Sequence, residues 1–270
     1  MQQQQMVMQQ QQMMVQLLAT RAPTAPPTPA PTATPTPIPT TLNPTTAPTT
    51  PRPTAAPTNP REDFTGALWF YLNFDEGNAE SSPAGSRAAG RALGSPQFRT
   101  YDQESSVRGT GYMHLAAHYN SYIDMGNSNL GQPSSMSLAA WVRTTNPNGY
   151  HRAIIHRQSS FSLQTKFTFL AYYCWCSPNS YITDQPINDG QWHHVASTMA
   201  DNTLIMYLDG VAVSSTSIGM GGGSGHVMVG RGAGGTAEGW FGDIDEAAMW
   251  IDRVLTAEEV SSIYQHGIGT

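Results

Sequence analysis

Short apolar or alternating stretches, separated by turn residues about every 8 to 12 positions, fill the chain from Asp63 to its end. Alternation of apolar and polar residues is the pattern of a β-strand whose neighbouring side chains point to opposite faces. Many short strands are typical of a two-sheet antiparallel sandwich. We therefore predict an all-β domain with a long loop at 78–97 and strands at 68–77, 113–116, 122–125, 137–143, 153–157, 161–164, 167–173, 193–199, 204–208, 211–214, 226–230 and 239–250.

The strongest pattern is a pair of stretches, GQWHHVA at 190–196 and LIMYLDGV at 204–211. Each is long enough for one strand, and a short polar gap lies between them. Asp209 and Gly210 are residues that accept the positive φ angles of a tight hairpin turn. The two stretches are predicted to form neighbouring antiparallel strands.

A short helix is predicted at the end of the chain. Thr256 and Glu259 have the spacing of a capping box, in which each side chain accepts a backbone N–H of the other residue. Val260, Ile263 and Tyr264 form one apolar stripe, and Gly267 is a helix stop. The helix is expected to pack on the sandwich.

The composition divides the chain into three parts, at 1–21, 22–61 and 62–270. Residues 1–20 are mostly Gln and Met, and 14 of the 20 prolines lie between residues 22 and 60. Proline disfavours helix, so residues 22–61 are predicted to be an extended Thr/Pro-rich stalk, with O-glycosylation of its threonines open and a flexible unmodified linker as the alternative. Residues 1–21 are predicted to be a helical or low-complexity tail that anchors or polymerises the protein, the alternative being disordered sequence.

The charge distribution argues against two classes of partner. The net charge is −6, and Arg21 and Arg52 are the only charged residues among residues 1–60. An acidic domain is a poor partner for nucleic acid or an anionic membrane. No stretch approaches the ~20 apolar residues of a membrane span. The Thr/Pro-rich stalk predicts an extracellular or cell-surface location.

Six motifs occur in order over roughly 63–267, namely LWFYLNFDEG at 68–77, YIDMG at 122–126, MSLAAWVRT at 136–144, WHHVA at 192–196, YLDG at 207–210 and GDIDE at 242–246. Together they resemble the LamG-like jelly-roll modules of the concanavalin A-like lectin/glucanase superfamily. The resemblance implies a jelly-roll sandwich. It implies less about a ligand, because this fold carries lectins, adhesion modules, enzymes and spacers.

The glucanase members of the superfamily carry an E-x-D-x-x-E strand that pairs two catalytic carboxylates. This motif does not occur here, and Asp243, Asp245 and Glu246 come nearest to it. Asp243 and Asp245 lie in the segment that is structural in the family. We therefore predict that the chain is not an enzyme.

The resemblance also implies a structural calcium ion. In related jelly rolls such an ion lies between the acidic end of the first strand and the late GDIDE strand. Here the residues implicated are Asp75 and Asp245, followed by Asn78 and Asp243. The alternative is that these carboxylates bond backbone amides or arginine with no ion.

Sugar-binding sites use aromatic platforms beside a few polar groups. The candidate ligand-binding residues are the aromatic residues and one histidine in the middle of the chain, namely Tyr150, His151, Tyr172, Tyr173, Trp175 and Tyr181. Core packing is the alternative explanation for about half of them. A glycan is therefore a possible partner, and its identity is open.

Cys174 and Cys176 are the only cysteines in the chain. In an extended strand their Cα atoms would be about 6.6 to 6.8 Å apart, at the limit for a disulfide. An intrachain bridge therefore needs a local kink. We favour the bridge, with free thiols and intermolecular pairing as alternatives.

The leading functional hypothesis is a non-catalytic structural or adhesive subunit of an extracellular surface assembly or filament, which associates with itself through residues 1–21. The alternative is a carbohydrate-binding module that tethers a surface or a partner to polysaccharide. Self-assembly through the tail, or glycan binding by the sandwich, distinguishes the two.

Overall fold

A computed structural model describes residue 64 and residues 66–268, with gaps at 80–87, 101–106, 117–119, 128–129, 147–149, 177–179, 224 and 234–237. The tail at 1–21 and the stalk at 22–61 lie outside the described residues, so the forms predicted for them stay predictions. The strands in chain order are β1 (Leu68–Leu72), β2 (Arg91–Leu93), β3 (Gln97–Thr100), β4 (Gly111–Leu115), β5 (Tyr122–Gly126), β6 (Ser135–Arg143), β7 (Arg152–Arg157), β8 (Phe161–Lys166), β9 (Phe169–Cys174), β10 (Ser180–Pro186), β11 (Trp192–Ala200), β12 (Thr203–Leu208), β13 (Val211–Ser217), β14 (Val227–Val229) and β15 (Gly242–Ile251), and the helix is α2 (Ala257–His266).

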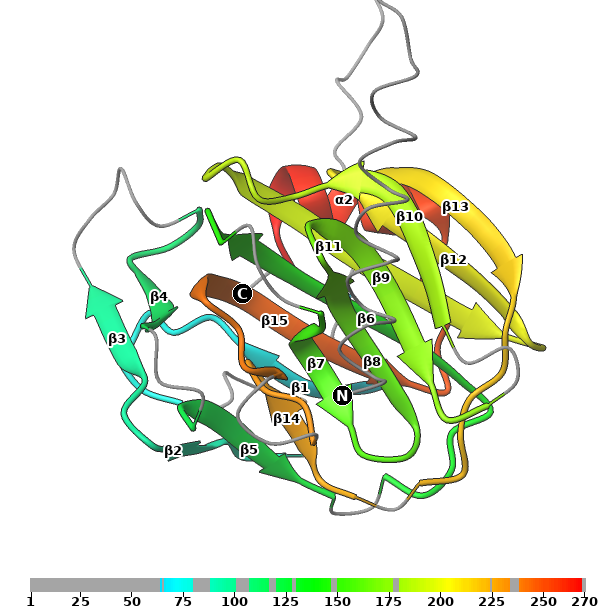
Figure 1. The fold of residues 1–270 in the computed structure, drawn as a ribbon, viewed down its shortest axis with the longest axis horizontal. Coiled ribbons are helices and arrows are strands. Elements are labelled where there is room, and N and C mark those ends of the chain that lie inside the picture. Colours follow the sequence, from blue (N-terminus) through cyan, green and yellow to red (C-terminus); the bar gives the residue numbers. More distant parts are fainter. Residues whose placement is uncertain are drawn as a thin grey trace, which may run out of the picture. The chain divides into compact units, whose positions relative to one another are not determined.

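The strands form two antiparallel sheets that pack face to face (Figure 1). Sheet A has the order β13-β12-β11-β6-β15-β4-β3, and β1 also pairs with β15. Sheet B has the order β10-β9-β8-β7-β14-β5-β2. This arrangement confirms the predicted all-β, two-sheet jelly-roll sandwich with one short C-terminal helix.

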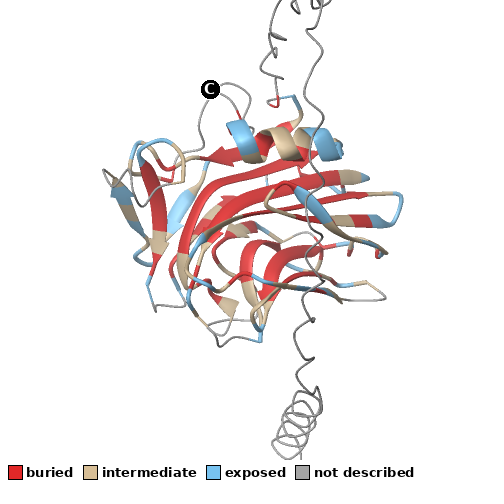
Figure 2. Cartoon of the chain, turned by 90° about the horizontal axis from the view of Figure 1, so that it is seen from above, coloured by how far each residue is buried: buried red, intermediate tan, exposed pale blue. Residues whose placement is uncertain are grey.

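The core lies between the sheets, and β6 shows how the sequence builds it. Met136, Leu138, Ala140 and Val142 point into the main hydrophobic cluster, while the residues between them face outward. Each fully buried Leu or Val side chain stabilises the fold by about 1.5–3 kcal/mol. The buried residues accordingly follow the strands of both sheets in Figure 2.

The helix α2 covers part of the outer face of sheet A. Thr256 Oγ1 accepts the backbone N–H of Glu259, and Glu259 accepts that of Thr256, so the predicted capping box is confirmed. Val260 and Ile263 are buried in a second hydrophobic cluster that includes Trp250 of β15. The helix ends at Gly267, whose φ of 81° suits a residue without a Cβ.

The predicted pairing of 190–196 with 204–211 is also confirmed. β11 pairs antiparallel with β12, and the turn between them uses Asp201 and Asn202 with positive φ. Asp209 (φ 50°) and Gly210 (φ 78°) turn the chain from β12 into β13. This hairpin is of the kind that the Asp-Gly pair predicts.

Three strands differ from the sequence-based prediction. β2 lies within the segment 78–97 that we predicted to be a loop, and β3 and β10 fall between predicted strands. β2 and β10 form the two edges of sheet B, β3 forms an edge of sheet A, and each pairs on one side only. An edge strand buries little apolar surface, so its sequence carries little of the pattern on which strand prediction depends.

Among the described residues, no helix is long and apolar enough to cross a membrane.

Candidate functional site

The register of sheet B decides which aromatic side chains reach the surface. Tyr173 of β9 pairs with Ser162 of β8, and Ser162 pairs with His156 of β7, so these three side chains share the outer face. Tyr172 pairs with Leu163 and Tyr181, and these side chains share the inner face. Because neighbouring residues of a strand point to opposite faces, Tyr172 and Tyr173 cannot belong to one site.

Aromatic rings on the outer face of β7, β8 and β9 form an unbroken series of contacts, which we call the aromatic row. The five contacts have ring centroids 4.5–5.7 Å apart and interplanar angles of 69–90°. Edge-to-face contacts of this kind stabilise the position of each ring. The members, in order along the row, are Phe167, Tyr150, His151, Tyr173, Trp175 and His156.

The aromatic row exposes much of its surface to solvent. Tyr150 is 63% exposed, Phe167 45% and Trp175 43%, although large aromatic residues are highly buried on average. His156 is buried beneath Trp175 and supports it. The row therefore presents ring surface that the fold itself leaves uncovered.

Polar groups accompany the rings. Gln164 Nε2 donates to His151 Nδ1 (2.5 Å), and the backbone N–H of Ala233 donates to His156 Nε2 (3.1 Å). Burial lowers the pKa of His156 to about 4. Burial, followed by the charge of Lys166, lowers the pKa of His151. Both imidazoles are therefore neutral at pH 7, and each accepts a hydrogen bond at one nitrogen.

Two further polar groups lie close to the row. Lys166 Nζ lies 5.0 Å from the centre of the Tyr150 ring, so one end of the row carries a positive charge. The hydroxyl of Ser162 is buried between the positions of Tyr173 and His156, and it has no hydrogen-bond partner among the described residues.

Four of the six predicted ligand-binding residues meet in the row, namely Tyr150, His151, Tyr173 and Trp175. The other two, Tyr172 and Tyr181, lie on the inner face of sheet B and are not part of the row. Tyr172 is fully buried, its hydroxyl donates to Met199 Sδ (3.8 Å), and burial raises its pKa. Tyr181 packs against the same core.

Sequence reasoning missed Phe167, His156 and Gln164. Phe167 was predicted to begin a strand, but it lies in the turn between β8 and β9 with a φ of 58°. His156 and Gln164 lie in strands and carry no signal of their own. The register of β7 with β8 brings His156 into the row and Gln164 next to it.

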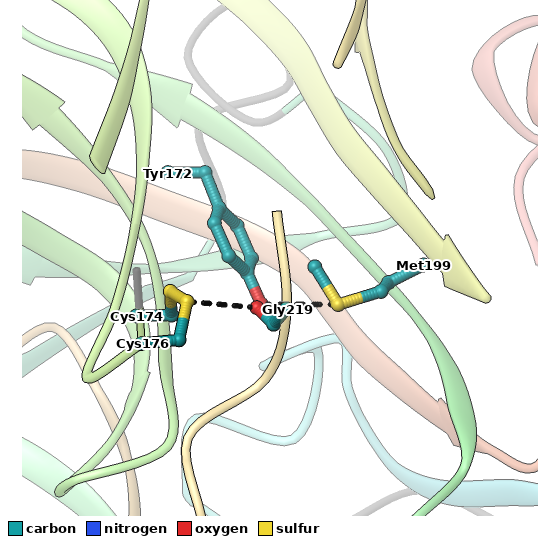
Figure 3. Close-up of a disulfide and its surroundings, with 5 residues drawn as sticks. All are labelled: Tyr172, Cys174, Cys176, Met199 and Gly219. Carbon is teal, nitrogen blue, oxygen red and sulfur yellow. Dashed lines mark hydrogen bonds between the residues drawn. A yellow bond between two sulfur atoms is a disulfide. The ribbon is translucent and has the colours of Figure 1, made fainter. Parts of the chain in front are cut away.

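Cys174 and Cys176 are joined by a disulfide (Figure 3). Their Cα atoms are 5.2 Å apart, which is less than the separation in an extended strand. The kink that a bridge requires is thus present, and it begins where β9 ends.

Among the four residues predicted to bind calcium, Asp75 and Asp243 have hydrogen-bond partners within the protein. Each carboxylate oxygen of Asp243 has a side-chain partner, since Arg143 Nε (2.8 Å) and His114 Nδ1 (2.6 Å) donate to them. Asp75 accepts the backbone N–H groups of Thr110 (2.5 Å) and Gly111 (3.1 Å). In the described part of the chain, no three His, Cys, Asp or Glu side chains are grouped closely enough to hold a metal ion.

Asp245 and Glu246 are buried in a different environment. Burial, with the neighbouring Glu246, raises the pKa of Asp245 well above its usual value. Burial raises the pKa of Glu246 to about 7, and the hydroxyl of Tyr71 donates to Glu246 Oε1 (2.5 Å). Both carboxyl groups therefore favour the protonated form more than an exposed carboxyl group does, and the prediction that Asp245 binds calcium stays a prediction.

A cavity of about 280 Å³ lies where the end of β1 meets the end of α2. Its lining combines both signs of charge, from Asp75 and Glu246 on one hand and Arg108 on the other. Arg108 also donates to the carbonyl of Tyr264 in α2 (2.5 Å). This hydrogen bond attaches the helix to the loop that precedes β4.

The described domain is similar in sequence and in structure to known proteins. The sequence profile of the concanavalin A-like lectin/glucanases superfamily matches residues 115–261, which is more than half of the chain. A search of curated protein sequences finds no match.

Among solved structures, domain 4 of AbnA, an extracellular arabinanase from Geobacillus stearothermophilus, has a TM-score of 0.58 at 19% identity, over 73% of this chain and 98% of that one. That structure is a complex with arabinotriose. The binding domain of botulinum neurotoxin DC, in complex with rat synaptotagmin II, has a TM-score of 0.52 at 12% identity, over 75% of this chain and 52% of that one. Botulinum neurotoxin type C, whose cell entry depends on two ganglioside molecules, has a TM-score of 0.52 at 12% identity, over 77% of this chain and 52% of that one. At these identities the likeness shows a shared fold.

Proposed function

Because the chain belongs to the concanavalin A-like lectin/glucanase superfamily, we propose that its sandwich is a carbohydrate-binding module whose ligand stacks on the aromatic row. The single observation that carries the proposal is the row itself. Each ring of the row contacts the next one, while Tyr150, Phe167 and Trp175 remain exposed to solvent. Exposed, rigid rings provide the apolar platform that the faces of a sugar require.

The polar groups of the row supply the second requirement of a sugar site. His151 is partly exposed and lies beside Tyr173, and the buried Gln164 holds the imidazole by donating to its Nδ1. Neutral donors and acceptors of this kind match sugar hydroxyls. A neutral or weakly acidic polysaccharide therefore fits better than a cationic ligand at the end of the row where Lys166 contacts Tyr150.

A binding function is favoured over catalysis. The similar structures include a domain of an arabinanase and binding domains of neurotoxins, although the superfamily also contains glucanases by its description. The buried carboxyl groups of Asp245 and Glu246 lie on sheet A, whereas the aromatic row lies on sheet B. That the chain is not an enzyme stays a prediction.

Affinity electrophoresis of the full chain with soluble polysaccharides tests the proposal. Arabinan is the first probe because of the arabinanase relative, followed by xylan, galactan and mixed-linkage β-glucan. We expect at least one of these to retard the wild type, and Trp175→Ala to weaken binding about tenfold or more, as truncation of a central aromatic contact does. Trp192→Ala is the matched control, because Trp192 lies on sheet A away from the row. Equal loss in both variants, or no retardation by any probe, would argue against the proposal.

The location and assembly of the protein extend this proposal. We propose that the stalk at 22–61 displays the module outside the cell or at its surface, as the Thr/Pro-rich composition indicates. The leading hypothesis from the sequence, in which residues 1–21 polymerise the protein, has no support from the similar structures. Negative-stain electron microscopy of the full chain beside a chain that begins at Asp63 would reveal filaments only in the former if the tail polymerises.

A further inference from the structure

The disulfide joins the two residues on either side of Trp175, an exposed ring near one end of the aromatic row. Cys174 is the last residue of β9, and its side chain is fully buried in the main core. Trp175 follows on the opposite face, and Cys176 returns to the bridge. The bonded sulfur atoms of Cys174 and Cys176 (Figure 3) therefore close a small ring of chain. By sequence, the middle residue of this ring is Trp175.

A second segment, which contains Gly219 and Gly221, contacts the disulfide and the base of Trp175. Cys176 Sγ lies 3.3 Å from the carbonyl oxygen of Gly219. The backbone N–H of Gly221 donates to the carbonyl of Ser160 (3.0 Å), and a Cβ at Gly221 would stand 3.1 Å from Trp175 Cβ. The glycines allow this segment to approach the base of Trp175 closely.

The disulfide and the glycine segment restrict the position of the Trp175 side chain more than they stabilise the whole domain. Trp175 is 43% exposed and touches Tyr173 and His156 by ring edges, so its packing alone leaves it room to move. A bridge between residues two apart closes a very short loop, and short loops restrict the unfolded chain less than long ones. The sandwich has its own core of buried residues from both sheets.

We propose that the Cys174–Cys176 bridge is a positioning element for carbohydrate binding, which holds Trp175 in the aromatic row, so that reduction of the bridge weakens binding while the sandwich stays folded. The inference rests on the proposed function. Without the bridge, the ligand must also order the backbone around Trp175. Ordering about one residue corresponds to about tenfold weaker binding. The site is thus active in an oxidising environment and weaker in a reducing one.

The test compares four forms of the full chain: oxidised wild type, wild type reduced with TCEP, the Cys174→Ala/Cys176→Ala variant and Trp175→Ala. The chain has two cysteines, so TCEP acts on this bridge alone. Affinity for arabinan, xylan, galactan and β-glucan is measured by affinity electrophoresis, and thermal unfolding reports the fold. The near-ultraviolet circular dichroism of Trp175, taken as the difference from Trp175→Ala, reports the ordering of the ring, which a purely structural role of the bridge would not change.

We expect reduction and the double alanine variant each to weaken binding about tenfold and to reduce the Trp175 dichroism, with the far-ultraviolet spectrum unchanged. TCEP should have no effect on the double variant. Unchanged affinity and dichroism on reduction would overturn the inference even if the wild type binds strongly. If no probe binds the oxidised wild type, the proposed function fails, and the dichroism still decides whether the bridge positions Trp175. If the double alanine variant unfolds, thermal unfolding of the reduced wild type shows whether the fold itself needs the bridge. A reduced wild type that is also unfolded would overturn the inference.

Discussion

The ring of Trp175 stands perpendicular to the ring of Tyr173, with the two centroids 4.8 Å apart. Tyr173 lies on the outer face of β9, and Trp175 is two residues further along the chain, on the same face. The contact therefore results from the period of the strand together with the kink at its end. It places two rings of the aromatic row side by side.

Substitution of the two neighbouring tyrosines of β9 should affect stability in one variant and polysaccharide binding in the other. Tyr172→Ala removes a fully buried ring and should lower the free energy of unfolding by about 3–5 kcal/mol. Tyr173→Ala should change stability much less and should weaken polysaccharide binding about tenfold. Urea denaturation and affinity electrophoresis of both variants check this. A Tyr173→Ala variant that unfolds readily but binds normally would contradict the assignment of the two faces.

Acid should destabilise the domain through His194. Its side chain is buried between Trp141 and Tyr264, and burial lowers its pKa from 6.5 to about 4. Between these two values the unfolded chain binds the proton and the folded chain does not, so stability falls as the pH falls from about 6.5 to about 4. The contribution is up to about 3 kcal/mol.

His194→Phe keeps the ring contacts and removes the titrating group, and neither ring nitrogen of His194 has a hydrogen-bond partner among the described residues. The melting temperature of this variant should therefore fall less between pH 7 and pH 4 than that of the wild type. His226→Phe is the control, because the side chain of His226 is 55% exposed. A parallel fall in the wild type and His194→Phe would refute the explanation.

Alkali should destabilise the domain through Glu246. Burial raises its pKa from 4.5 to about 7, so the stability that it contributes is complete below pH 4.5 and is lost as the pH rises through 7. Glu246→Gln retains an oxygen that can accept from Tyr71 and carries no charge. We expect this variant to be more stable than the wild type at pH 8, by up to about 3 kcal/mol, with the difference shrinking at pH 4.5. Glu258→Gln, at an exposed position of α2, should show no such pH-dependent gain in thermal unfolding.

Removal of calcium should leave the melting temperature unchanged. Asp243 binds Arg143 and His114, and Asp75 binds backbone N–H groups, so these carboxylates have partners without an ion. Thermal unfolding in EGTA and in calcium chloride measures the difference. A lower melting temperature in EGTA that calcium restores, and that Asp245→Asn abolishes, would instead favour an ion between Asp75 and Asp245.

Local sequence determined the elements that depend on near neighbours. The capping box of Thr256 and Glu259 and the hairpin turn at Asp209 and Gly210 were predicted because each requires only residues a few positions apart. The alternating pattern likewise predicted most strands and the sandwich. Edge strands such as β10 were missed because they bury too little surface to leave that pattern.

The tertiary structure alone decided which side chains form the candidate site. Alternation shows that Tyr172 and Tyr173 face opposite sides, but only the packing of sheet B on sheet A determines which side is the core. Tyr150 and Phe167 meet because β7 and β8 pair in one register, and Asp243 meets Arg143 across two strands. The physical reason is that a strand's period is a local property of the chain, whereas its register and its inward face depend on the strands and the sheet against which it packs.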